Sequence, residues 1–139
     1  MTRFALPLLG MILVTTPALA ADFVAMESGQ IEFTMPSGNI GCIYTPEGGT
    51  ENYEPEGEGP ELSCDRVAPT YVRITLPGEG EPTRLDDVKD ASCCGAQNEF
   101  DYGDTWSFDG FLCASATTGL RCSRGEHGFF LSRARIEAW

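Results

Sequence analysis

The chain has 139 residues, with 21 acidic against 9 basic side chains and a formal net charge of −12. This length fits one domain with one modest hydrophobic core. So large an excess of acid argues against binding to nucleic acid or to anionic lipid, because both depend on lysine and arginine. A basic protein or a divalent cation would be attracted instead.

The first 20 residues have the layout of a secretory signal peptide. A short basic start, residues 1–3, precedes an apolar run, residues 4–14, and small residues follow up to Ala20. We predict cleavage between Ala20 and Ala21. The apolar run is shorter than the roughly 20 residues of a membrane-spanning helix, and no later segment is comparable. We therefore expect residues 21–139, with a net side-chain charge of −13, to be exported to the periplasm or beyond without a membrane span.

Apolar and polar residues alternate over much of the remaining chain, as they do in half-buried antiparallel strands. The alternation is clearest at residues 31–35 and 72–76. Turns containing glycine, proline or asparagine separate most of the strand patterns, and no long helical stripe is present. Residues 21–139 are therefore predicted to form one all-β domain, a small disulfide-stapled antiparallel sandwich or barrel built of hairpins. The other predicted strands are residues 40–44, 106–108, 110–115, 119–123, 128–131 and 133–138.

Two segments are predicted to be loops. Residues 45–61 hold six glutamates, no basic residue and few apolar groups, so little burial would offset the entropy of ordering them. Residues 77–90 form the second loop, and Leu85 and Val88 are expected to pin its far end.

All six cysteines follow the predicted signal peptide, and in an oxidising compartment an even number is typical of a disulfide framework. Cys113 and Cys122 lie symmetrically about a turn at residues 117–119, which predicts a cross-strand disulfide. Closing that loop is worth about 2.7 kcal/mol in loop-closure entropy. Cys42 and Cys64 bracket the acidic loop and are predicted to form a second disulfide, worth about 3.4 kcal/mol.

Cys93 and Cys94 are adjacent in the sequence and remain unassigned. A bond between them gains only about 1.2 kcal/mol in loop-closure entropy. Three alternatives stay open: a vicinal disulfide, two thiols, or one of the two replacing a partner assigned above. A thiol-redox role is one interpretation of this pair. The neighbouring Asp90 and Glu99 argue against it, because nearby carboxylates disfavour a thiolate.

No metal, cofactor or catalytic residue is predicted. Cys113, Cys122 and the only histidine, His127, superficially resemble a zinc pattern, but the second close ligand pair of a structural zinc site is missing. His127 lies between glycines and is interpreted as a turn residue bonded to the backbone. The weak calcium candidates are Asp101, Asp104 and Asp109, which lack the spacing of a twelve-residue calcium loop and are expected in solvated turns.

Three stretches carry a resemblance to a known family: FTMPSGNIGC (33–42), LSCDR (62–66) and GFLCASATTGLRCSRGEHGFFLSR (110–133). Together they resemble a bacterial exported family known as domain of unknown function 6636, whose members share F-x-x-P-S-G-N-I-x-C and G-H-G-F-x-[LI]-S-R. The acidic insertion at 45–61 and the adjacent cysteines depart from that pattern. The resemblance implies an extracytoplasmic domain and supplies no catalytic residues.

These observations favour a non-enzymatic, extracytoplasmic interaction or structural module, such as a periplasmic inhibitor or accessory domain. Its aromatic and acidic surface is expected to recognise a basic protein or an envelope component. The alternative is a thiol-redox protein that uses Cys93 and Cys94.

Overall fold

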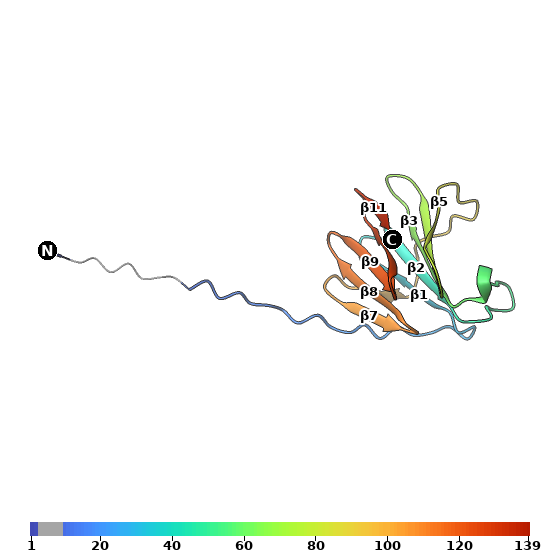
Figure 1. The fold of residues 1–139 in the computed structure, drawn as a ribbon, viewed down its shortest axis with the longest axis horizontal. Coiled ribbons are helices and arrows are strands. Elements are labelled where there is room, and N and C mark those ends of the chain that lie inside the picture. Colours follow the sequence, from blue (N-terminus) through green and yellow to red (C-terminus); the bar gives the residue numbers. More distant parts are fainter. Residues whose placement is uncertain (3–9) are drawn as a thin grey trace.

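Two β-sheets face each other in the computed structural model, which describes residues 1–2 and 10–139 (Figure 1). The first sheet has six strands in the order β5-β4-β3-β2-β1-β6, all antiparallel except for the short parallel pair β1–β6. These strands are β1 (Ile31–Thr34), β2 (Ile40–Thr45), β3 (Glu61–Arg66), β4 (Val72–Pro77), β5 (Thr83–Leu85) and β6 (Asn98–Glu99).

The second sheet has five antiparallel strands in the order β11-β10-β9-β8-β7. Consecutive strands pair as hairpins in both sheets; most are joined by short turns, but the acidic loop joins β2 to β3, and β6 returns beside β1 before the chain enters the second sheet. The all-β class is confirmed, and the two separate sheets form a sandwich. The strands are β7 (Thr105–Phe108), β8 (Phe111–Ala116), β9 (Gly119–Arg124), β10 (His127–Leu131) and β11 (Ile136–Ala138).

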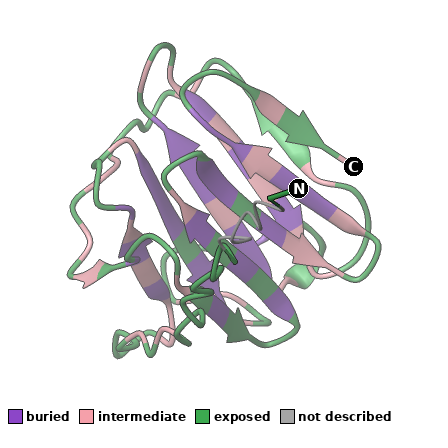
Figure 2. Cartoon of the chain, turned by 90° about the vertical axis from the view of Figure 1, so that its left-hand side faces the viewer, coloured by how far each residue is buried: buried purple, intermediate pink, exposed green. Residues whose placement is uncertain are grey.

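The core lies between the sheets and is rich in aromatic rings. Figure 2 shows that buried residues lie mainly on the strands and exposed residues in the loops. Phe33 of β1 is only 1% exposed, and its ring packs against those of Phe23, Phe100 and Trp106 at centroid distances of 4.9, 5.2 and 5.3 Å. Aromatic pairs at such distances add to the free energy gained from burial.

Each sheet carries one cross-strand disulfide on its inner face. Cys42 pairs with Cys64 between β2 and β3, and Cys113 pairs with Cys122 between β8 and β9, with Cα–Cα distances of 4.1 Å in both. Both predicted pairs are confirmed. The β8–β9 hairpin has no bulge, and Gly119 adopts a φ of +145°; a Cβ there would lie 2.5 Å from the Leu131 carbonyl oxygen.

The loop predictions need correction. Strand β3 was not predicted, and the acidic loop is shorter than expected, because Thr45 and Glu61 are hydrogen-bonded ends of β2 and β3. A single 3-10 turn, η1 (Glu56–Glu58), lies within it. The predicted second loop contains the edge strand β5, in which Leu85 is 47% exposed and therefore does not pin the segment. Pairing with β4 orders this strand instead.

The segment after the predicted signal peptide is part of the fold. Ala21 donates a backbone hydrogen bond to Thr105 at 2.6 Å, and Phe23 packs on the core. The predicted signal peptide lies partly outside the described residues, at 3–9, and the cleavage between Ala20 and Ala21 stays a prediction. Within the described ranges, no helix has the length and apolar character to cross a bilayer.

Candidate functional site

A groove of about 270 Å³ runs over the outer face of the six-stranded sheet. Its floor comes from β1 to β4. The acidic loop closes one end, and the segment 90–96 closes the other. Its lining includes Glu32, Thr34, Gly41, Ile43, Thr45, Tyr53, Glu61, Ser63, Asp65, Arg73, Thr75, Asp90, Cys93 and Cys94.

The floor of the groove combines polar and apolar groups, because alternate residues of each strand face outward. Ile43 of β2 is 38% exposed and offers an apolar contact. Ser63 of β3 lies opposite both Ile43 and Thr75, and its hydroxyl is 3.1 Å from that of Thr75. The middle of the groove therefore offers one apolar side chain beside two hydroxyl groups.

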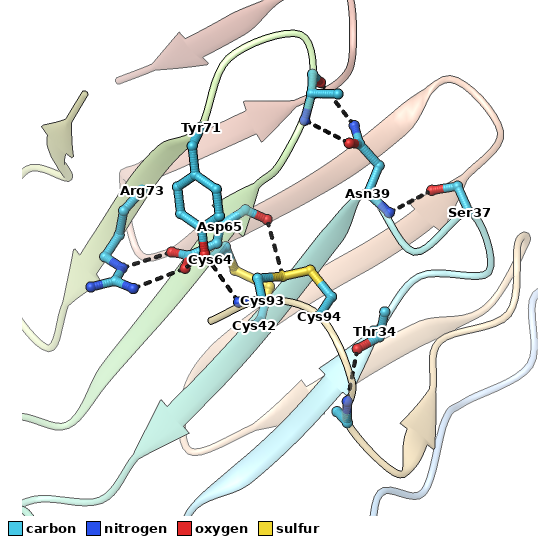
Figure 3. The surroundings of a disulfide bond; sticks show 12 residues. Thr34, Ser37, Asn39, Cys42, Cys64, Asp65, Tyr71, Arg73, Cys93 and Cys94 are labelled. Carbon is cyan, nitrogen blue, oxygen red and sulfur yellow. Dashed lines mark hydrogen bonds and ion pairs between the residues drawn. A yellow bond between two sulfur atoms is a disulfide. The ribbon is translucent and has the colours of Figure 1, made fainter. Parts of the chain in front are cut away.

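Cys93 and Cys94 form a vicinal disulfide at one end of the groove (Figure 3). Both residues are half-buried, and both sulfur atoms lie on the β2 backbone at Gly41. A Cβ at Gly41 would lie 2.8 Å from the sulfur of Cys93 and 2.9 Å from that of Cys94. Only glycine at position 41 therefore leaves room for this pair.

Asp65 anchors the same end of the groove. This residue is 7% exposed, and its carboxylate accepts hydrogen bonds from Arg73 at 2.7 and 2.9 Å and from the Tyr71 hydroxyl at 2.5 Å. The Tyr71 oxygen in turn accepts the backbone N–H of Cys93 at 3.1 Å (Figure 3). Burial and the bond to Asp65 raise the pKa of Tyr71. Asp65 thus holds the vicinal disulfide in place through Tyr71.

Arg73 is fully engaged by carboxylates. Besides Asp65, its guanidinium contacts Asp90 at 2.9 Å. The hydrogen bond to Asp65 is the main reason that the pKa of Arg73 is raised. The hydrogen bond from Arg73 lowers the pKa of Asp90. This guanidinium is therefore occupied by two carboxylates.

Glu61 lies at the other end of the groove and has a different environment. The residue is 4% exposed, and its carboxylate accepts a hydrogen bond from the Tyr53 hydroxyl. Glu61 takes part in none of the ion pairs found among the described residues. Burial is the main cause that raises the pKa of Glu61. The Tyr53 hydrogen bond and Arg73 oppose this rise, and the nearby Glu56 adds to it. Burial and the bond to Glu61 also raise the pKa of Tyr53.

The groove is therefore negatively charged. Its lining holds four carboxylates, those of Glu32, Glu61, Asp65 and Asp90, against the single guanidinium of Arg73. That guanidinium already pairs with two of the four, and Glu32 and Glu61 form no ion pair with any residue of the described part of the chain. A groove walled by protein concentrates such a potential and attracts positive ligands.

No catalytic or metal site was predicted from the sequence, and the one redox candidate, the pair Cys93 and Cys94, lines this groove. Of the three residues with a superficial zinc pattern, Cys113 and Cys122 are disulfide-bonded in the core, and Nδ1 of His127 lies 3.3 Å from the Trp139 carbonyl oxygen. These three residues are thus a disulfide staple and a backbone-bonded histidine. The groove residues of β1 to β4 were missed. Glu61 and Asp65, on either side of Cys64, were a signal, because carboxylates in a strand are rarely buried without a reason.

The three calcium candidates do not share a site. Asp101 and Asp104 form a turn before β7, in which the Asp104 N–H donates to the Asp101 carbonyl oxygen at 3.2 Å. Asp109 follows β7 and accepts a hydrogen bond from the Tyr44 hydroxyl at 2.5 Å. Because β7 separates them, one ion cannot contact all three. No group of three or more potential metal ligands occurs within the described part of the chain.

A second hollow, of about 380 Å³, lies at one end of the sandwich, where parts of the family-like stretches meet. Its polar groups serve the fold: the Asn39 side chain bonds the backbone of Ala68 in both directions, and the Ser132 hydroxyl donates to Arg135. Arg133 is the one charged side chain in its lining. We therefore regard the groove as the stronger site. No family model, curated protein or solved structure matches the chain.

Proposed function

We propose that the chain is an exported, non-enzymatic interaction module that binds a basic partner protein in the groove over the six-stranded sheet. The observation that supports this most is the groove's charge, four carboxylates against one guanidinium that is already paired. The three disulfides favour an oxidising compartment for this role.

The shape of the groove suits a protein segment. Asp65 and Glu61 mark its two ends and are four residues apart on β3, about 13 Å along the strand. That span accommodates an extended segment of roughly four residues or a long side chain. Ser63 and Thr75 bond to each other, and this arrangement supports binding rather than catalysis, since a nucleophile would pair with a base.

A matched pair of double variants tests this proposal. Glu32→Gln with Asp90→Asn removes two charges from the groove, whereas Glu51→Gln with Glu54→Gln removes two from the exposed acidic loop. We expect the mature protein to bind a basic protein such as lysozyme at low ionic strength, measured by fluorescence anisotropy. The groove variant should bind several-fold more weakly, because local charge governs electrostatic complementarity.

The loop variant should keep nearly full affinity. Equal losses in the two double variants would mean that only total charge matters, and this would contradict a specific site. No association with basic proteins even at low ionic strength would contradict the proposal itself.

Thiol-redox activity is the second candidate, favoured by one observation. Cys93 and Cys94 are half-buried at the groove, whereas the other four cysteines are at most 3% exposed. A dithiol reductant could therefore reach this pair first. Alkylation and mass measurement over graded potentials tests the candidate: a redox role requires reversible reduction near physiological potentials, and a pair still oxidised below about −300 mV would exclude it.

A further inference from the structure

The geometry points to one specificity pocket within the groove: we propose that Glu61 and Tyr53 receive the ammonium or guanidinium head of a single lysine or arginine side chain of the partner. This inference rests on the proposed function and deepens it, because it assigns the cationic group of the partner and the two residues that bind it.

Glu61 differs from the other buried charged residues in its bonding partners. Three charged residues are buried among the described residues: Glu61, Asp65 and Arg66. Asp65 has the guanidinium of Arg73 and the hydroxyl of Tyr71. Arg66 donates to the carbonyl oxygens of Thr70 and Ser132 and to the Thr70 hydroxyl. Glu61 has the Tyr53 hydroxyl but forms no ion pair, and Arg73 acts on it only from beyond ion-pair distance.

Burial of the Glu61 carboxylate carries a free-energy cost. A carboxylate removed from water needs a compensating partner, and burial without one disfavours its charged form. The raised pKa of Glu61 agrees with that environment. A cation of the partner supplies the missing counter-charge. The unfavourable burial of the Glu61 carboxylate in the free protein is therefore offset in the complex. Binding sites commonly carry such a stability cost.

The side chains around Glu61 suit the aliphatic part of a lysine or arginine side chain. Ile43, 38% exposed, lies diagonally across from Glu61 on the same face of the sheet, since Ile43 pairs with Ser63 and Thr45 with Glu61. The Tyr53 side chain is 47% exposed at the wall of the groove. An aliphatic stem of lysine or arginine would contact these two side chains while its charged head reaches Glu61, as such stems commonly pack on apolar surface.

The test uses a defined probe, the blocked peptide Gly-Gly-Lys-Gly-Gly, and the full mature protein with its disulfides intact. Calorimetry at low ionic strength should give a Kd that is about tenfold weaker for Glu61→Gln. Tyr53→Phe, which removes the hydroxyl that orients the carboxylate, should weaken binding less. Glu126→Gln, which removes the same charge from an exposed turn outside the groove, should change the Kd by less than twofold.

The free Glu61→Gln protein should unfold at a higher temperature than the unmodified chain at neutral pH. Because the folded-state pKa of Glu61 is raised, its contribution to stability is present at low pH and lost as the pH rises through that pKa. The advantage of glutamine should therefore shrink on acidification. The titratable groups that act on Glu61, namely Tyr53, Glu56 and Arg73, are common to both proteins and drop out of the comparison.

The outcomes separate the two proposals. A Glu61→Gln protein that binds the peptide within twofold of the unmodified chain overturns the Glu61 pocket, while groove-dependent binding of a basic protein would leave the proposed function standing. A peptide with norleucine in place of lysine that binds equally well also overturns the pocket. Failure of every cationic probe to bind would overturn both.

Discussion

Replacing Cys113 and Cys122 together by alanine should lower the free energy of unfolding by about 2–5 kcal/mol. The disulfide between them is buried in the core, joins β8 to β9 and closes a loop of the second sheet. Its removal restores conformational entropy to the unfolded chain and leaves a defect in a packed interior. Urea denaturation of residues 21–139, with the other disulfides kept oxidised, measures the loss.

Two controls accompany this variant. Replacing Cys93 and Cys94 by alanine should cost about 1 kcal/mol, because neighbouring residues close almost no loop. His127→Ala should cost on the order of 1 kcal/mol, the value of a hydrogen bond. If His127→Ala or a chelator unfolded the domain while the Cys113/Cys122 variant stayed folded, these three residues would belong to a metal site. The assignment of Cys113 and Cys122 to a stabilising disulfide would then be wrong.

Phe33→Ala should lower stability by about 3–5 kcal/mol, the range for truncating a buried aromatic side chain. Phe33 contacts three other rings, from the N-terminal segment, the loop before β7 and β7 itself. The change therefore removes contacts that join both sheets and leaves a cavity among them. The same denaturation experiment reports the effect.

Phe108→Ala provides the comparison for Phe33→Ala. Phe108 also contacts aromatic rings but is 42% exposed, so its truncation should cost about 1 kcal/mol. Equal losses for the two variants would contradict the placement of the core around Phe33.

Most of the strands and two disulfides were predictable because they follow from local patterns. Alternation at residues 31–35 and 72–76 assigned β1 and β4, and the symmetry of Cys113 and Cys122 about a glycine turn set their pairing. Strand β3 was missed because Glu61 was assigned to the acidic loop and because both ends of the strand, Glu61 and Arg66, are charged. Their burial depends on Tyr53, Thr70 and Ser132, which the fold brings near.

The groove could not be predicted because no local pattern encodes it. Tyr53 belongs to a segment that composition marks as solvated, and the Cys93–Cys94 pair reaches the sheet only where Gly41 lacks a side chain. Short strands such as β5 and β6 likewise depend on neighbours for their pairing. Outer-face residues of several strands become a site only when loops distant in sequence close over them.

The most direct measurement of the binding site is a heteronuclear NMR titration of isotope-labelled residues 21–139 with the blocked lysine peptide. The groove account predicts that the largest amide shift changes occur at residues 41–45, 61–65 and 73–75, on the outer face of the six-stranded sheet. Shift changes confined to the exposed glutamates of the acidic loop, or to the second sheet, would contradict it.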